Sequence, residues 1–315
     1  MHIAQMGTGR VGRPTAYAIM CAEIADKITV CDTKPGLANA FAEELQHVTA
    51  SLRLDIEIIA SEKDEDVAGA DIILISAGKP RIPGVQMTRR DLAVQNGQIV
   101  KHVAESTVPN NPDAKYVVVT NPVDAMAMVC KKYSKAKFVI STGTNLESLR
   151  FRSRLARTLK VPVSTVEGYV GGEHGQNATI LWSTVKVNCM LLSEYLKLNG
   201  KTLNKNELED YVKSVSKLIV DNIGGTEFGP AAAFRDIVRA IVKNTNKILP
   251  VASPINFTGL PEPVFVSVPL KLGTTIGSST YDTLSSKEKQ ELADAAKAIY
   301  ETYKTTIEAI EKSSK

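Results

Sequence analysis

The alternation of short apolar runs with helical segments over the first half of the chain is the feature that most restricts its fold. Some runs are apolar throughout, such as Ile-Ile-Leu-Ile at 72–75 and Val-Val-Val at 117–119, as expected for strands covered on both faces. Six strands joined by helical crossovers predict an α/β fold built on a doubly wound parallel sheet. The strands are predicted at residues 2–6, 27–31, 55–60, 71–76, 116–120 and 138–141.

The pattern changes near residue 145. Predicted helices are mixed there with strands of antiparallel type, such as 264–268. Ser285 and Glu288 form a capping-box pattern that opens a long terminal helix. The other helices are predicted at residues 146–159, 205–222 and 230–244. We therefore expect two domains, residues 1–144 and an α+β domain at 145–315, with an extensive interface because no flexible linker separates them.

Charge and cysteine spacing exclude several classes of protein. The net charge of +4 is small for 315 residues, so nucleic acid is a poor partner. The four cysteines show no paired spacing, which favours reduced structural thiols. The first strand begins at residue 2, and no apolar run is long enough to cross a bilayer. The expectation is a soluble, cytoplasmic protein with no membrane partner.

A glycine-rich turn between the first strand and the first helix predicts a dinucleotide site. Gly7 permits a tight turn, Gly9 lets the backbone approach a pyrophosphate, and Gly12 allows close helix–strand packing. Asp32 follows at the end of the second strand, where a carboxylate binds ribose hydroxyls and repels a 2′-phosphate. This favours NAD, although Lys34 leaves some use of NADP open. The turn consists of Gly7, Thr8, Gly9, Arg10, Val11 and Gly12.

Charged residues far apart in the sequence predict the reacting site. A loop at 78–89 follows the fourth strand, at the sheet edge where ligands bind, and its Pro and Gly residues suit a hinged lid. Arg81 and Arg89 in this loop, together with Arg150 and His174, are suited to hold a small dicarboxylic acid. The arginines would bind carboxylates and polarise a carbonyl, and the histidine would carry a proton. A hydride carrier beside such a site predicts a dehydrogenase.

Six segments in order resemble the lactate/malate dehydrogenase family, in particular its lactate-dehydrogenase-like malate dehydrogenases, over nearly the whole chain. They are Gly-Thr-Gly-Arg-Val-Gly, Pro-Arg-Ile-Pro-Gly, Thr-Arg-Arg-Asp-Leu, Thr-Asn-Pro-Val-Asp, Gly-Thr-Asn-Leu-Glu-Ser-Leu-Arg and Gly-Glu-His-Gly. The resemblance implies a Rossmann domain, a second α+β catalytic domain, NAD as cofactor and no metal. It also implies a homo-oligomer, with a tetramer favoured and a dimer possible.

The resemblance assigns catalytic roles to four residues. His174 would protonate the carbonyl oxygen during reduction and act as base in reverse, with a pKa close to that of imidazole in water. Glu147 would pair with His174 and fix its tautomer. Arg150 would bind the C1 carboxylate through two N–H groups. Arg89 would polarise the carbonyl as the lid closes.

The resemblance also places residues around the substrate and the cofactor. Asn121 would hydrogen-bond near the nicotinamide and the substrate oxygen, and Thr226 would lie on the opposite wall of the pocket. The cofactor residues implied besides the glycine-rich turn and Asp32 are Ala77, Gly78, Asn96, Thr120 and Asn121.

Substrate choice is predicted to depend on Arg81. Lactate enzymes of the family typically carry glutamine at the matching position, and malate enzymes carry arginine. An enclosed cation needs the second carboxylate of oxaloacetate, and pyruvate would leave it unpaired at a cost of about 3–5 kcal/mol. We therefore expect a malate dehydrogenase of the tricarboxylic acid cycle.

The chain departs from the family pattern at several positions. Glu147 stands where aspartate is usual, and its extra methylene moves the carboxylate, although pairing with His174 is still expected. An insertion of two residues at 85–86 lengthens the lid and predicts relaxed specificity, including some pyruvate turnover. Gln176 replaces an aspartate near His174, which reduces repulsion of an anionic substrate. Allosteric lactate enzymes of the family bind fructose bisphosphate with an arginine and a histidine. Arg152 matches that arginine, but Glu167 stands in the place of the histidine and would repel phosphate, which predicts no response to this activator.

Other functions stay open at this point. The nearest is a lactate or broader 2-hydroxy-acid dehydrogenase. NAD-dependent glycosidases share the fold family but need a metal-binding Cys/His pair, which the four histidines do not suggest. A non-catalytic NAD-binding module would have no use for the three residues Arg89, Arg150 and His174 together.

Overall fold

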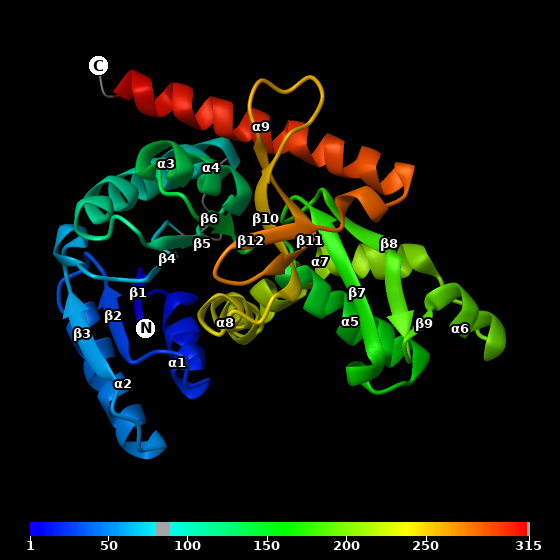
Figure 1. The fold of residues 1–315 in the computed structure, drawn as a ribbon, viewed down its shortest axis with the longest axis horizontal. Coiled ribbons are helices and arrows are strands. Elements are labelled where there is room, and N and C mark those ends of the chain that lie inside the picture. The colour runs from blue at the N-terminus through cyan, green and yellow to red at the C-terminus, as the bar shows by residue number, and fades with distance from the viewer. Residues whose placement is uncertain (80–88, 314–315) are drawn as a thin grey trace.

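The computed structural model describes residues 1–79 and 89–313 (Figure 1). The strands are β1 (His2–Met6), β2 (Lys27–Cys31), β3 (Glu57–Ser61), β4 (Ile72–Ile75), β5 (Lys115–Val118), β6 (Val139–Ser141), β7 (Val166–Gly172), β8 (Ala178–Val187), β9 (Met190–Leu191), β10 (Lys247–Ile255), β11 (Val264–Leu272) and β12 (Ile276–Ser279). The helices are α1 (Gly12–Cys21), α2 (Leu37–Leu52), α3 (Arg89–Thr107), α4 (Val123–Ser134), α5 (Asn145–Leu159), α6 (Leu192–Leu198), α7 (Lys205–Ile223), α8 (Phe228–Val242) and α9 (Ser286–Ser313).

The first six strands form the predicted parallel sheet, in the order β3-β2-β1-β4-β5-β6. The order reverses direction at β1, which pairs with β2 on one side and with β4 on the other. The doubly wound fold expected from the apolar runs is therefore confirmed. At such a reversal a crevice opens beyond the carboxyl ends of the strands, where ligands bind.

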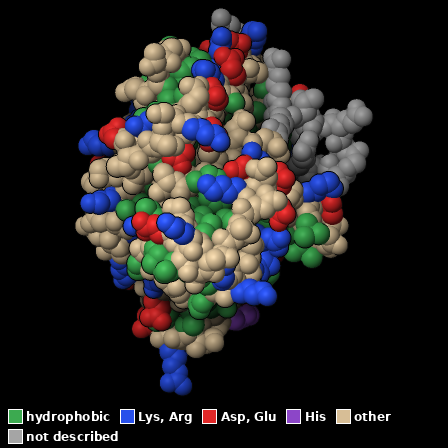
Figure 2. All heavy atoms as spheres, turned by 90° about the vertical axis from the view of Figure 1, so that its right-hand side faces the viewer, with side chains coloured by type: hydrophobic (Ala, Val, Ile, Leu, Met, Phe, Trp, Pro, Cys, Tyr) green, Lys and Arg blue, Asp and Glu red, His purple; other side chains and the backbone are tan. Residues whose placement is uncertain are grey.

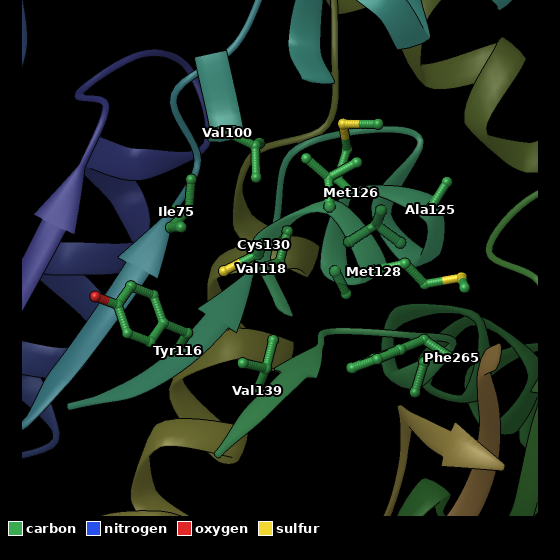
Figure 3. Packing of buried hydrophobic residues seen from close by; sticks show 14 of the residues in the cluster. Ile75, Val100, Tyr116, Val118, Ala125, Met126, Met128, Cys130, Val139 and Phe265 are labelled. Carbon is green, nitrogen blue, oxygen red and sulfur yellow. The ribbon is translucent and has the colours of Figure 1, made fainter. Parts of the chain in front are cut away.

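Each central strand is buried on both faces because helices cover the sheet on both sides. Ile73 and Ile75 of β4 point into one apolar cluster, and Ile72 and Leu74 point into the other, as the two-residue repeat of a strand requires. Figure 3 shows part of the first cluster, in which side chains of β5 and α4 face one another, among them those of residues 118 and 130.

The second half of the chain extends the same sheet instead of forming a separate one. Ala252 of β10 pairs antiparallel with Ser141 of β6, and the order continues β10-β11-β7-β8-β9. Within the described residues the strands thus form one twelve-stranded sheet, with β12 paired to β11. The predicted helices in this half lie within two residues of α5, α7 and α8. The division into domains at residue 144 stays a prediction.

The terminal helix begins at the predicted capping box. The Ser285 backbone N–H and hydroxyl donate to Glu288 Oε2 at 2.8 and 2.7 Å, and the Glu288 N–H donates to Ser285 Oγ at 3.3 Å. The apolar face of α9, including Leu292 and Ile299, then packs on the cluster shared with α3 and α4. A helix late in the sequence therefore covers the first half of the sheet.

Charges of both signs are mixed over the face drawn in Figure 2, which agrees with the small net charge. In the described part of the chain, no helix has the length and apolar character that crossing a membrane requires. The cysteines are free, Cys31 and Cys130 buried, Cys21 and Cys189 exposed.

Candidate active site

The glycine-rich turn is shaped by contacts that only glycine permits. Gly7 has φ +88°, and a Cβ there would lie 2.5 Å from the backbone nitrogen of Ala77. A Cβ on Gly12 would lie 2.0 Å from Gly7 O, so α1 can begin this close to β1 only with glycine. At Gly9 a Cβ would meet no atom within 4 Å, because this glycine faces an open cavity.

Asp32 is held in the expected place at the end of β2. Its Oδ2 accepts hydrogen bonds from the backbone N–H of Thr8 at 2.8 Å and from the Thr8 hydroxyl at 3.0 Å. Its Oδ1 accepts from the Lys34 N–H at 3.0 Å. Thr8 is fully buried, so its side chain positions Asp32. Lone pairs of Asp32 are left for ribose hydroxyls.

A cavity of about 560 Å³ lies along the carboxyl edge of β1, β2 and β4. It is lined by Gly7, Gly9, Cys31, Asp32, Thr33, Asp64, Ser76, Ala77, Gly78, Lys79, Gln95, Gln98, Ile99, His102 and Val103. Among the described residues, no side chain caps the N-terminus of α1, which leaves its amides for an anion. Gln95 Oε1 is buried without a described partner. These features fit a dinucleotide: the α1 amides suit its phosphates, Asp32 suits a ribose, and Gln95 Oε1 suits an amide N–H donor.

Two of the expected cofactor residues, Asn96 and Thr120, stabilise the loops around the cavity without lining it. The Asn96 side chain accepts from Lys79 N at 2.7 Å and donates to Asn121 O at 2.7 Å, so it joins the loops after β4 and β5. The Thr120 hydroxyl donates to Ala77 O at 2.7 Å. Both side chains are buried, and neither lines the cavity. Their place in the site is to fix the backbone that a cofactor would touch.

Sequence reasoning missed the polar side of α3. Gln95, Gln98 and His102 line the cavity from this helix, at a spacing that puts them on one face. That spacing was the available signal. Asp64 also lines it, and its Oδ1 accepts from the Cys31 thiol at 3.3 Å. Burial raises the pKa of Asp64.

Arg10 lies differently from its neighbours in the turn. Its Nη1 donates to Ile223 O at 3.3 Å and forms an ion pair with Glu227. Val11 lines a second cavity. The guanidinium of Arg10 is therefore turned toward the second half of the chain, and only its backbone stays with the glycine-rich turn.

The second cavity, of about 240 Å³, brings together residues that the sequence scatters over a hundred positions. It is lined by the predicted Asn121, Glu147, Arg150, His174 and Thr226. Asn121 follows β5, Glu147 and Arg150 lie in the first two turns of α5, and Thr226 lies between α7 and α8. Lys213 and Ser216 of α7 also line it, and sequence reasoning missed both. Their one-turn spacing on an amphipathic helix gave only a weak signal.

The imidazole and the carboxylate meet as expected despite the longer side chain of glutamate. Glu147 Oε1 lies 3.0 Å from His174 Nδ1, which leaves Nε2 for the substrate side. Arg150 Nη1 lies 3.5 Å from the same oxygen, and Oε2 is buried without a described partner. Burial would raise the pKa of Glu147, but His174 and Arg150 outweigh it and lower that pKa.

Asp124 is a second carboxylate at His174 that sequence reasoning gave no role. Its Oδ2 accepts from the His174 backbone N–H at 2.9 Å, and its Oδ1 accepts from the Ser141 hydroxyl at 2.6 Å. Asp124 is buried in the first turn of α4, and burial raises its pKa to about 6. The signal was an acidic residue directly after Asn-Pro-Val at the carboxyl edge of β5.

The pKa of His174 is about 8, higher than the solution-like value expected from the sequence. Burial alone would lower it, but the charge and hydrogen bond of Glu147 outweigh burial, and Asp124 adds a further negative charge. The site thus holds a protonated imidazole at neutral pH beside Arg150, whose side chain is 12% exposed. Such an arrangement can bind a carboxylate and deliver a proton to an oxygen atom.

Residues 80–88 of the lid lie outside the described residues. Arg81 and the insertion at 85–86 are among them, and the side chains of Arg89 and Arg90 are also not described. Their assignments therefore stay predictions. In the described part of the chain, no group of three or more His, Cys, Asp or Glu side chains is arranged to hold a metal ion.

Comparisons with known proteins identify the family. The NAD binding domain of lactate/malate dehydrogenases matches residues 1–139, and the alpha/beta C-terminal domain of the same family matches residues 144–310. The malate dehydrogenase of Sulfurisphaera tokodaii is 42% identical over 99% of this chain and 98% of its own length. L-lactate dehydrogenase 1 of Clostridium acetobutylicum is 31% identical over 95% of this chain and 96% of its own length.

Solved structures agree on the fold. The minor L-lactate dehydrogenase of Enterococcus mundtii has a TM-score of 0.89 and 26% identity, and the match covers 96% of this chain and 98% of that one. The two family domains together span almost the whole chain, and the relatives match it over nearly their full length. These matches establish the family. The chain belongs to the lactate/malate dehydrogenase family and uses NAD as its cofactor.

Proposed function

We propose that the protein is a malate dehydrogenase, which transfers a hydride reversibly between malate and NAD through a proton relay of His174 and Glu147. The observation that supports this most is the cavity in which Arg150, His174, Asn121 and Thr226 meet, at the same sheet edge as the dinucleotide cavity. When bound, NAD supplies or accepts the hydride at the substrate C2 atom.

The residues of this chain do the remaining work. Arg150 binds the C1 carboxylate of the substrate and thereby sets the position of C2. His174, protonated below its pKa of about 8, gives its proton to the carbonyl oxygen through Nε2. Glu147, 3.0 Å from Nδ1, fixes the tautomer and stabilises the imidazolium. Asn121 and Thr226 orient the substrate from opposite walls, and Arg89 polarises its carbonyl.

The preference for malate over lactate rests on Arg81 and on the relatives. A guanidinium enclosed with the substrate pairs with the second carboxylate of oxaloacetate and is stranded by the methyl group of pyruvate. The relative with 42% identity is named a malate dehydrogenase, whereas L-lactate dehydrogenase 1 of Clostridium acetobutylicum is 31% identical. The second candidate is a broader 2-hydroxy-acid dehydrogenase, which the lengthened lid favours.

Specificity constants for oxaloacetate and pyruvate, each with NADH and NADPH, separate these functions. We expect oxaloacetate to exceed pyruvate by at least about 100-fold, because the stranded charge costs about 3–5 kcal/mol. Arg81→Gln is expected to remove most of that preference, while Lys79→Gln, which removes a nearby charge, keeps it. Equal constants for the two acids, or an unchanged preference in Arg81→Gln, would contradict the malate assignment.

A homo-oligomer, a tetramer or a dimer, goes with this proposal, as does a cytoplasmic place in the tricarboxylic acid cycle. A groove of about 380 Å³ between α1 and α2 supports self-association, and Tyr17 in it is 51% exposed. Sedimentation of the purified protein measures the state directly.

A further inference from the structure

Arg10 connects the glycine-rich turn, which the proposed reaction uses for the cofactor, with the segment carrying Thr226, which it uses for the substrate. It lies between Gly9, which faces the dinucleotide cavity, and Val11, which lines the substrate cavity. Its side chain leaves the turn and reaches the segment between α7 and α8. There Nη1 donates to Ile223 O at 3.3 Å and pairs with Glu227.

The segment that Arg10 contacts carries Thr226 of the substrate wall. Gly224 ends α7 with φ +79°, and its N–H donates to Val220 O at 2.9 Å. Glu227 is the residue from which α8 begins. A cation at the last carbonyl of α7 and a carboxylate at the start of α8 are both favoured by the helix dipoles. Arg10 and Glu227 therefore fasten the two helix ends on either side of Thr226.

Packing makes this contact specific. A Cβ on Gly225 would lie 2.6 Å from Arg10 Cδ, so the arginine stem lies directly against the backbone next to Thr226. In addition, α8 packs against α1, the helix that the glycine-rich turn opens (Figure 1). The Arg10 side chain is 49% exposed and that of Glu227 is 31% exposed. An exposed pair of this kind adds little to global stability. We expect the Arg10–Glu227 pair to fix the position of the segment that carries Thr226.

We propose that Arg10 is a positioning residue that, with Glu227, holds the Thr226 segment against the glycine-rich turn, so that the substrate wall is set by the same turn that receives the cofactor. This rests on the proposed placement of the substrate against Thr226. A wall displaced by a fraction of an ångström weakens substrate binding, because oriented contacts depend steeply on distance.

The test uses steady-state kinetics with whichever 2-oxo acid the wild-type protein reduces best, together with NADH affinity measured by nicotinamide fluorescence. We expect Arg10→Met and Glu227→Gln each to raise KM for the 2-oxo acid about tenfold, with kcat within about twofold and the NADH Kd within about threefold. The conservative variant Arg10→Lys, which keeps a cation beside Ile223 O and Glu227, should retain a large part of the affinity that Arg10→Met loses.

The two single changes distinguish positioning from long-range attraction. Arg10→Met removes a positive charge and Glu227→Gln a negative one, so attraction of an anionic substrate alone would shift KM in opposite directions. Positioning shifts both upward. Lys217→Met is the matched control, because Lys217 pairs with Asp221 on the exposed side of α7 and its loss removes the same charge.

Three results would overturn the inference. One is an unchanged KM in both single variants, and another is opposite shifts of KM. The third is an NADH Kd that rises as much as KM, which would make Arg10 a cofactor ligand. If the wild-type protein reduces no 2-oxo acid at all, the proposed function itself fails, and this outcome is distinct from the other three.

Discussion

At the scale of single residues, the charge state of His174 is set by three neighbours that come from different elements. Glu147 of α5 accepts from the ring, Asp124 of α4 accepts from the backbone N–H, and Arg150 opposes both with a positive charge. Burial alone would keep the imidazole neutral. The two carboxylates reverse this, and the pKa of His174 becomes about 8. A proton donor that is charged at pH 7 suits reduction of a 2-oxo acid.

This pKa predicts opposite pH profiles for the two directions. In the proposed mechanism reduction needs protonated His174, so its kcat/KM should be level below pH 8 and fall about tenfold per unit above it. Oxidation needs the neutral imidazole, so its kcat/KM should rise up to about pH 8 and then level off. In Asp124→Asn, which removes one negative charge, both midpoints should move down toward 6.5, the ordinary value. Initial rates between pH 5.5 and 9.5 measure this.

Glu173→Gln is the control, because it removes a carboxylate next to His174 in the sequence that is not among the charges shifting the pKa of His174. Its midpoints should stay with those of the wild-type protein. A reduction profile in Asp124→Asn that coincides with that of the wild type would show that Asp124 does not influence the reacting proton.

At the scale of elements, α9 is fastened at its start by more than its own capping box. Glu288 Oε1 accepts from the Ser183 N–H at 2.9 Å, and Oε2 accepts from the Ser183 hydroxyl at 2.8 Å, in addition to the Ser285 contacts. Burial would raise the pKa of Glu288, but these hydrogen bonds outweigh it and lower that pKa. One carboxylate thus caps a helix and ties it to β8.

We expect Glu288→Gln to lower the free energy of unfolding by about 1–3 kcal/mol, because buried donors on Ser183 and Ser285 lose a charged acceptor. A folded pKa below the ordinary 4.5 means that this stabilisation is present above pH 4.5 and is lost as the pH falls through the folded value. Urea unfolding at several pH values measures both effects. Glu291→Gln, which removes a carboxylate that pairs with Lys287 at a half-exposed position of the same helix, should change little, and an equal loss in that control would refute the assignment.

At the scale of the whole molecule, the C-terminal helix packs on the N-terminal half of the chain. The last helix, α9, packs on α3 and α4, which cover the first half of the sheet. A Cβ on Gly97 of α3 would lie 2.4 Å from Thr306 Cγ2 of α9, so the two helices are in direct contact. Val100, Val103 and Met126 are buried in a cluster that includes Ile299 and Tyr303. The apolar cover of the NAD-binding half therefore comes from the other end of the sequence.

A fragment of residues 1–144 is expected to fold poorly for this reason. Without α9, and without β10 beside β6, its apolar face and one sheet edge are exposed. Circular dichroism should show no cooperative thermal transition in the fragment. In the full chain, dichroism and the fluorescence of the single tryptophan, Trp182, should change in one coincident transition. A sharp transition in the fragment alone would show that the first half is independent.

The sequence by itself determined the elements and the class of chemistry. The strands of the parallel sheet, the glycine-rich turn between β1 and α1 and the capping box of α9 follow from local backbone geometry and from the period of strands and helices. The structure has these elements where the sequence predicts them, because such rules act within a few residues. Asp32 lies at the end of β2, as expected, and its binding of a ribose stays a prediction. The resemblance placed Glu147, Arg150 and His174 in one site, and the structure brings them into one cavity.

Only the tertiary structure decided which distant groups meet. Four contacts join segments that no local pattern relates. They are Asp124 with His174, Arg10 with Glu227, Gln95 with the dinucleotide cavity, and α9 with α3. The pKa of His174 could not be read from the sequence for the same reason, since electrostatic energies depend on distance and burial in space. Local steric rules fix the elements, and the packing of the folded chain fixes which charges surround His174.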